Sequence, residues 1–186
     1  MPAANQCRPA VLSRRDFVRT STLAAGAAAL TGPFIRSARA HEPGANSRVR
    51  LGLIGCGGVG RGDLECFFRN PEVDCAVLAD VDDSHLANGL EVCAKHKRPK
   101  PDTVRDFRRV LDRKDVDVVL IATPDHWHAL PTVLACQAGK DVYVEKPLAT
   151  TIDEGRAMLT ASQKHNRIVQ MGSQWRSCTH IIEAAE

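Results

Sequence analysis

A glycine-rich turn after an apolar stretch constrains this chain more than any other feature. Residues 49–54 (VRLGLI) predict a buried strand, and residues 55–60 (GCGGVG) match the pattern G-x-G-x-x-G. A helical pattern follows, and Asp80 closes the next apolar run. Glycines allow helix N-terminal N–H groups to approach a pyrophosphate, and an acid about 20 residues further on can accept hydrogen bonds from a ribose. The sequence therefore predicts nucleotide binding, with a purely structural strand-to-helix turn as the alternative.

Strand and helix patterns alternate along the rest of the chain. Short apolar runs predict strands, and segments of about 10–15 residues with helical periodicity lie between them. This alternation predicts an α/β fold, a doubly wound parallel sheet. The expected strands are 49–54, 74–80, 103–106, 116–122, 141–145 and 168–171, and the expected helices are 58–69, 84–97, 107–113, 125–138, 152–166 and 179–186.

The N-terminus has the pattern of an export signal. Residues 13–19 (SRRDFVR) contain twin arginines, a weakly apolar stretch covers about 20–35, and Ala38-Arg39-Ala40 matches a cleavage site. We expect a Tat-type signal peptide over residues 1–40, a linker over 41–47, export by the Tat machinery and a periplasmic location. The alternative is a membrane anchor, but glycine and proline interrupt the stretch and it is shorter than the ~20 residues of a membrane span.

The positive net charge belongs to this signal. Taking away the six Arg and one Asp of residues 1–40 from the 25 basic and 22 acidic residues of the chain leaves 19 basic and 21 acidic residues, a net charge of −2. Such a charge gives no reason to expect a nucleic-acid partner.

The cysteines do not have the spacing of a metal site, and we predict no metal. In an exported protein they could form disulfides, but a Tat substrate folds before export, where thiols stay reduced. We interpret them mostly as small buried apolar residues. Six lie beyond the signal: Cys56, Cys66, Cys75, Cys93, Cys136 and Cys178.

Chemistry is expected in loops beyond the carboxyl ends of the strands, where open α/β sheets bind ligands. Besides the glycine turn, these loops follow Asp80, cover 122–128 (ATPDHWH) and cover 145–147 (EKP). Lys146 is the strongest catalytic candidate, because a lysine beside a nicotinamide can help move a substrate hydroxyl proton during hydride transfer. The alternative is a surface lysine paired with Glu145. His126 and His128 could contact cofactor or substrate, or be loop histidines with structural hydrogen bonds.

These residues together resemble the glucose–fructose oxidoreductase / inositol dehydrogenase family (Gfo/Idh/MocA). The motifs that carry the resemblance are GCGGVG at 55–60, LADVD at 78–82, DVDVVLIATPDHWH at 115–128, AGKDVYVEKPLA at 138–149 and MGSQWRS at 171–177. The resemblance implies that Asp80 holds the adenosine ribose and favours NAD over NADP, that Glu145 and Lys146 face the nicotinamide and substrate, and that a cis peptide bond precedes Pro147. The cofactor-binding residues it implies are Gly55, Gly57, Gly58, Val59, Gly60, Asp80, Thr123, Pro124, His128, Glu145, Lys146 and Pro147.

The resemblance also implies a domain plan. Residues 48–172 are expected to form the dinucleotide-binding Rossmann domain, and residues 173–186 the start of a truncated second α/β domain. In the family, that domain covers the nicotinamide and often forms the oligomer, so we expect a homo-oligomer of the full-length form.

Three functions remain open from the sequence. The first is an NAD-dependent oxidoreductase that acts on a sugar, inositol or related polyol, with Lys146 assisting the hydroxyl proton. The second is a glycosidase that uses bound NAD for transient oxidation. The third is a nucleotide-binding product without activity.

Overall fold

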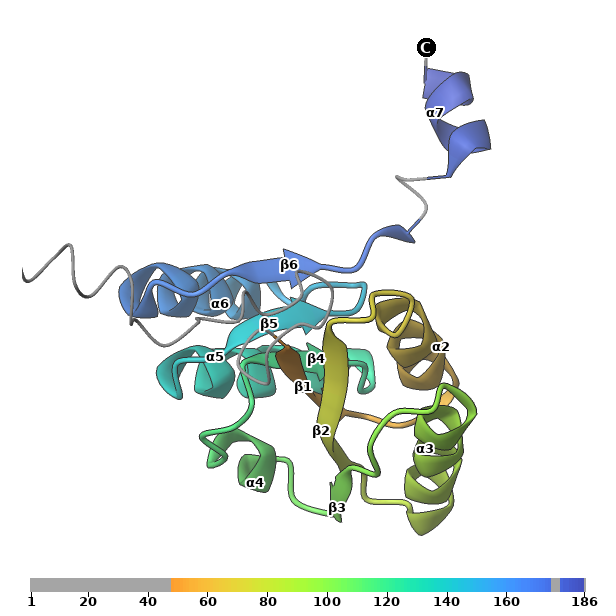
Figure 1. Cartoon of the computed structure of the whole chain (residues 1–186). Helices are drawn as coiled ribbons and strands as arrows, with labels where there is room; N and C mark the ends of the chain where they lie inside the picture. Colours follow the sequence, from red (N-terminus) through yellow and green to blue (C-terminus); the bar gives the residue numbers. More distant parts are fainter. Residues whose placement is uncertain (1–47, 175–177, 186) are drawn as a thin grey trace, which may run out of the picture. The chain divides into compact units, whose positions relative to one another are not determined.

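The six strands form one wholly parallel sheet of order β3-β2-β1-β4-β5-β6, which confirms the expected α/β fold class (Figure 1). The computed structural model describes residues 48–174 and 178–185, so the signal and linker predictions for residues 1–47 lie outside it. The strands are β1 Val49–Ile54, β2 Val73–Ala79, β3 Asp102–Val104, β4 Val118–Ile121, β5 Asp141–Val144 and β6 Val169–Met171.

Helices cover both faces of the sheet. Leu51 and Leu53 of β1 pack against one helical layer, formed by α2 and α3, while Ile54 belongs to the core on the opposite side, beneath α4, α5 and α6 (Figure 1). Strand β2, which lies between β3 and β1, is buried along its whole length, as expected of a parallel strand covered on both faces. The helices are α2 Gly58–Phe67, α3 Asp83–Lys95, α4 Arg108–Leu111, α5 Ala129–Gln137, α6 Ile152–His165 and α7 Thr179–Ala185.

The expected helix over 125–138 is divided in two, which corrects the sequence-based prediction. A 3-10 turn, η1 (Asp125–Trp127), precedes α5, which begins at Ala129. Pro131 has no N–H, so it could not donate the backbone hydrogen bond expected in the interior of a helix that started at Asp125. It is tolerated in the first turn of a helix that starts at Ala129.

Most cysteines match the expectation of burial. Cys56, Cys75, Cys93 and Cys136 are buried, whereas Cys66 is exposed and Cys178 is partly exposed. All six thiols are free in the described part of the chain.

The strand order reverses direction at β1. The chain passes from β1 to β2 and β3 on one side, then returns to build β4, β5 and β6 on the other. Gly55 follows β1 at this switch point with φ of 93°, and a Cβ there would lie 2.6 Å from the carbonyl oxygen of Ala122. Only glycine fits this close backbone approach. The reversal of strand order at the same place opens the crevice where such sheets bind ligands.

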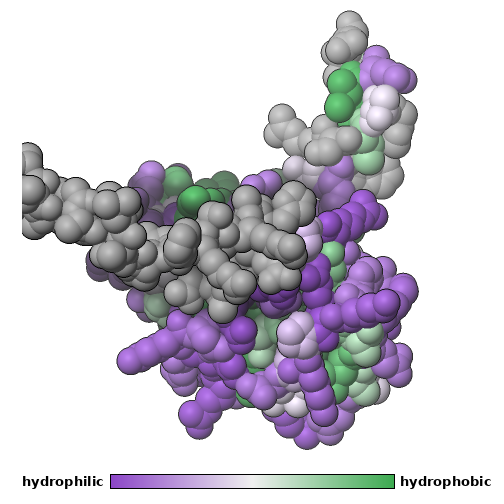
Figure 2. Space-filling view, in the orientation of Figure 1, coloured by the Kyte–Doolittle hydropathy of each residue, from purple (hydrophilic) through white to green (hydrophobic). Residues whose placement is uncertain are grey.

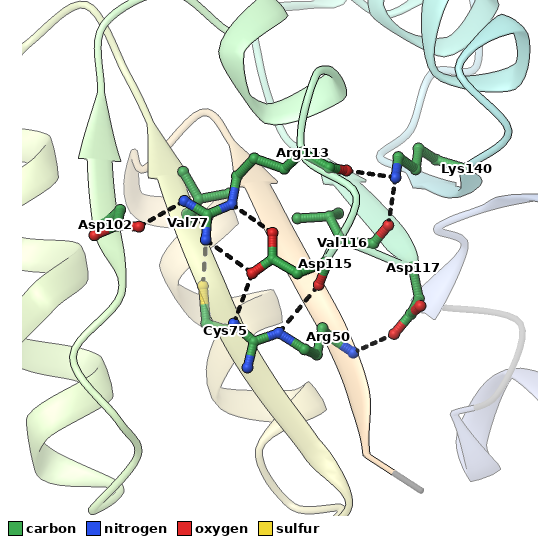
Figure 3. Close-up of polar contacts among 9 residues, drawn as sticks. All are labelled: Arg50, Cys75, Val77, Asp102, Arg113, Asp115, Val116, Asp117 and Lys140. Atoms are coloured by element: carbon green, nitrogen blue, oxygen red, sulfur yellow. Dashed lines mark hydrogen bonds and ion pairs between the residues drawn. The ribbon is translucent and has the colours of Figure 1, made fainter. Parts of the chain in front are cut away.

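A network of ion pairs ties the strands together at the opposite, amino-terminal edge (Figure 3). The Asp115 carboxylate accepts two hydrogen bonds from Arg113, at 2.9 and 2.8 Å, and one from Arg50 of β1 at 2.9 Å. Arg113 also reaches Asp102 of β3. The Arg113 hydrogen bonds, with help from Arg50, lower the pKa of Asp115 to about 2. Its small stabilising contribution is therefore lost as pH falls from about 4 through about 2.

Lys140 adds a buried contact to this edge. It is 8% exposed, and its Nζ donates to the carbonyl oxygens of Arg113 at 2.6 Å and Val116 at 2.7 Å (Figure 3). No sequence pattern singles out this lysine. The contact joins the start of β5 to the loop before β4, so one side chain satisfies two carbonyl groups that water reaches poorly.

Replacing Lys140 by Met is expected to lower the free energy of unfolding by about 1–3 kcal/mol, because two carbonyl oxygens lose their donor. Urea unfolding followed by circular dichroism measures this. The matched control is Lys114→Met, which changes an exposed lysine of the same loop and should shift stability by no more than about 0.5 kcal/mol. Equal stability of the two variants would contradict the role given to Lys140.

Candidate functional site

A cavity of about 880 Å³ lies beyond the carboxyl ends of β1, β2, β4 and β5. Its size is in the range of cofactor sites. Residues from all the loops that the sequence singled out contribute to its wall, together with the loop after β3. Of the expected cofactor-binding residues, those that line it are Gly55, Gly57, Gly58, Val59, Asp80, Thr123, Pro124, Glu145 and Lys146; Gly60, His128 and Pro147 do not.

The glycine turn presents the start of α2 to this cavity. Gly57 caps α2 without any side-chain hydrogen bond, whereas Asp82 caps α3 and Thr151 caps α6. A Cβ on Gly57 or Gly58 would point into open space. The first N–H groups of α2 are therefore not used by side-chain caps, as an anion site at a helix N-terminus requires.

Gly60 acts from below the cavity. It is buried, and a Cβ at this position would overlap the carbonyl oxygen of Gly55 and lie 3.1 Å from Cβ of Ala122. The third glycine of the motif thus allows α2 to pack closely on the turn, and does not itself line the cavity.

Asp80 braces the glycine turn as well as lining the cavity. Its carboxylate accepts hydrogen bonds from the N–H groups of Cys56 at 2.7 Å and Asp82 at 2.9 Å, and Nδ1 of His85 lies 3.3 Å away. The bond to Cys56 links the end of β2 to the turn after β1. Sequence reasoning assigned Asp80 to a ribose alone, since this long-range contact has no sequence signal.

Cys56 is a structural residue within the turn. Burial, followed by the nearby Asp80 charge, raises the pKa of its thiol to about 12. The thiol therefore stays protonated at neutral pH and is a poor nucleophile.

The loop after β3 forms a wall that the sequence analysis missed. Phe107 lies edge-on to Trp127 with 6.4 Å between ring centroids, and both line the cavity. Arg105 donates to the carbonyl oxygen of Val81 at 2.7 Å and pairs with Asp83 at 3.4 Å. The signal that could have found this wall is topological: β3 is parallel to β2, so its carboxyl end lies at the same edge.

His128 holds two loops together beneath the cavity. It is 1% exposed, and its ring nitrogens lie 2.6 Å from the carbonyl oxygen of Pro147 and 2.9 Å from that of Thr123. The division of the expected helix at this point turns its ring into the protein. His128 thus has the structural hydrogen bonds that the sequence left as an alternative, with both ring nitrogens against backbone carbonyl oxygens.

The Glu145-Lys146-Pro147 turn combines a buried acid with an exposed base. The Lys146–Pro147 bond is cis, as the resemblance implied, and Lys146 is exposed at the cavity wall. Glu145 is 2% exposed and accepts the backbone N–H of Lys146 at 3.1 Å and the Gln174 amide at 2.7 Å. Glu145 therefore interacts with the backbone of Lys146, and not with its ammonium as the surface-pair alternative required.

Neither a metal cluster nor a membrane-spanning helix is present in the part of the chain that the structure describes. Among residues 48–174 and 178–185, no cluster of three His, Cys, Asp or Glu side chains has the arrangement of a metal site. No helix in the same part of the chain has the length and apolar character that crossing a membrane requires.

Residues 49–173 match the model of the Gfo/Idh/MocA family, described as an oxidoreductase family with an NAD-binding Rossmann fold. Among curated relatives, a glycosyl hydrolase family 109 protein of Shewanella pealeana is 31% identical over 77% of this chain. An α-N-acetylgalactosaminidase of Shewanella oneidensis is 32% identical over 66% of it. These matches cover 35% and 28% of the relatives, so the chain spans about a third of their length.

Solved structures share the fold. The WlbA dehydrogenase from Bordetella pertussis, in complex with NADH and UDP-GlcNAcA, has a TM-score of 0.62 at 22% identity over 71% of this chain and 37% of that one. A variant of a 3-ketoreductase from Actinomadura kijaniata, in complex with TDP-benzene and NADP, has a TM-score of 0.65 at 20% identity over 74% and 42%. Both likenesses concern the Rossmann fold alone.

Two glycines that lie two residues apart on α2, Gly60 and Gly62, provide a test of the turn. Gly60→Ala should lower the free energy of unfolding by about 1–3 kcal/mol, because the new Cβ meets the Gly55 carbonyl. Gly62→Ala places a Cβ in open space on the same helix and should raise it by up to about 1 kcal/mol. Urea unfolding measures both, and equal shifts would show that α2 does not depend on close packing at Gly60.

Proposed function

The chain belongs to the Gfo/Idh/MocA oxidoreductase family, and from this premise we propose that it binds NAD and contributes to hydride transfer between the nicotinamide and a sugar, inositol or related polyol. The observation that carries the proposal is the cavity, which places the uncapped start of α2, the Asp80 carboxylate and the exposed Lys146 on one continuous wall. Because the chain spans about a third of the length of its curated relatives, this activity is proposed for the whole protein.

The residues present fit an extended dinucleotide. The N–H groups of Gly57 and Gly58 would hold the pyrophosphate, since nothing fills the space in front of them. Asp80 lies on the β2 side, where its carboxylate would accept hydrogen bonds from the adenosine ribose. The aromatic wall of Phe107 and Trp127 would contact the rest of the adenosine there. The nicotinamide would then extend over β4 and β5, towards Lys146.

Lys146 has the position of a proton-handling group. The bound nicotinamide would supply the hydride acceptor or donor. The neutral Lys146 amine would hydrogen-bond the substrate hydroxyl and accept its proton while the carbon is oxidised, and the resulting ammonium would return that proton in the reverse direction. Its backbone is held by Glu145 and by the His128 contact to Pro147, which orients the turn without neutralising the ammonium.

Two features support NAD rather than NADP. The carboxylates of Asp80 and Asp82 line the ribose end of the cavity and would repel a 2′-phosphate. The Arg105 guanidinium, which could otherwise attract that phosphate, already bonds Val81 and Asp83. Solved structures of the same fold hold either NADH or NADP, so this preference depends on the local charges.

The second candidate is a glycosidase that uses bound NAD. It is favoured by the names of the curated relatives, a family 109 glycosyl hydrolase and an α-N-acetylgalactosaminidase. Both candidates begin with oxidation of a sugar hydroxyl and use the same residues of this chain. They differ in outcome, because a glycosidase returns the hydride and releases a free sugar.

Asp80→Asn tests the cofactor preference. The amide keeps one acceptor for the backbone of the glycine turn but loses the charge, so we expect the NAD-to-NADP affinity ratio to fall about 10- to 100-fold. Isothermal titration calorimetry with both dinucleotides measures it. Asp112→Asn, an exposed acid outside this cavity, should leave the ratio unchanged. An unchanged ratio in Asp80→Asn would remove the ribose assignment.

Lys146→Ala tests the reaction. In the whole protein, turnover should fall about 10²- to 10⁴-fold while NAD affinity is retained. NADH formation is followed with a panel of sugars and polyols, and release of sugar from an N-acetylgalactosaminide is followed in parallel. Lys164→Ala on α6 is the control. Sugar release without net NADH would favour the glycosidase, and a retained rate in Lys146→Ala would show that another group handles the proton.

A further inference from the structure

Glu145 lies on the α2 side of the sheet, away from the exposed face of its own turn. Side chains two residues apart on a strand share a face, and Tyr143 packs edge-on against Phe67 of α2. Glu145 follows Tyr143 with the same orientation and is enclosed there. A Cβ on Gly172 would overlap Oε1 of Glu145 and lie 2.6 Å from Oη of Tyr143. This acid is therefore packed into the protein and not solvated.

A second acid, Asp63 of α2, meets Glu145 in this enclosure. Its Oδ2 is buried and has no hydrogen-bond donor among the described residues. The charge of Glu145 and a hydrogen bond to it both act to raise the pKa of Asp63, so the two carboxyl groups lie near each other. Two carboxyl groups can hydrogen-bond each other only when one of them carries a proton, and the charge of one carboxylate favours keeping that proton on the other. A proton on Asp63 would supply the missing partner and donate to Glu145.

Burial, followed by the Glu145 charge, raises the pKa of Asp63 to about 6. The folded protein thus holds this proton more tightly than the unfolded chain does. The stability it contributes is complete below about pH 4 and is lost as pH rises through about 6.

The other groups around the pair fit a single shared proton. Lys146 is the cation that faces it, and the Gln174 amide donates to it. From β5, the Tyr143 phenol faces both acids, and burial together with their charges raises its pKa to about 12. Cys66 of α2 lies near the Tyr143 phenol. One lysine and one amide donor balance a single negative charge on the two acids better than they balance two negative charges.

We propose that Asp63 and Glu145 share one proton beneath the nicotinamide end of the cavity, and that loss of this proton shifts the site towards the oxidised cofactor. The inference rests on the proposed function, because it requires a dinucleotide in the cavity. Asp63 is a positioning residue in this scheme, since it acts through Glu145 on the Lys146 turn and does not line the cavity.

The direction follows from charge. The nicotinamide ring is cationic in NAD⁺ and neutral in NADH, and Glu145 lies at the cavity wall. A nearby cation makes the pair release its proton more readily, so by linkage NAD⁺ gains affinity relative to NADH as pH rises. A difference of about half to one pKa unit between the two complexes corresponds to a roughly three- to tenfold change in the affinity ratio.

The first experiment follows the proton without any cofactor. Carbon-13 NMR of the side-chain carboxyl groups is recorded against pH in the wild-type chain, Asp63→Asn and Glu145→Gln. We expect one carboxyl of the pair to titrate well above the ordinary range in the wild type, and the remaining acid to return towards that range in each variant. Ordinary, independent titration of both acids in the wild type would overturn the shared proton.

The second experiment measures NAD⁺ and NADH affinity between about pH 5 and pH 8. The wild-type ratio should change about three- to tenfold in favour of NAD⁺, and the ratio for Asp63→Asn, which keeps the size and a donor, should not change. Glu65→Gln, an exposed residue of the same helix paired with Lys95, should behave as the wild type. A pH-independent wild-type ratio would overturn the cofactor preference. Failure of both dinucleotides to bind would instead overturn the proposed function and this preference with it, while the NMR titration still decides the shared proton.

Discussion

The close backbone approach between the glycine turn and the ends of its neighbouring strands is the constraint on which the site depends. Gly55 donates to Ala79 of β2 at 2.8 Å, and Ala122, just after β4, donates to Ile54 at 2.9 Å. These bonds hold the turn against both neighbours of β1, and Asp80 adds a side-chain bond to Cys56. The start of α2 is thereby fixed with its N–H groups directed at the cavity. An anion site of this kind costs little reorganisation when its ligand arrives.

The two ends of the cavity differ in electrostatic character. One end combines the Asp80 carboxylate with an arginine that is already paired. The other end presents the exposed Lys146 beside the buried Glu145. Most of the visible surface of the described residues is hydrophilic in Figure 2, in keeping with the salt-bridged strand edge of Figure 3.

The sequence predicted the fold and most of the cavity wall because those features have local signals. Strand periodicity, the glycine pattern and the acid after β2 all act over a few residues, and the cis bond before Pro147 came from family resemblance. The remaining features are decided at a distance. His128, which the sequence left as either a cofactor contact or a loop histidine, bonds two loops together, and the expected helix around it is divided ahead of Pro131. The wall containing Phe107 was missed because only the position of β3 beside β2 brings it to the site.

By itself the sequence determined that the chain forms a parallel α/β sheet with a glycine turn, an acid and a lysine at the strand ends, since hydrophobic periodicity and glycine placement are local properties. Tertiary structure alone decided which face each side chain took. Burial turned Glu145 towards α2, where it meets Asp63, an acid 82 residues earlier in the chain. It also left Lys146 exposed at the cavity. Such pairings arise from strand order and close packing, which join residues that no short sequence pattern connects.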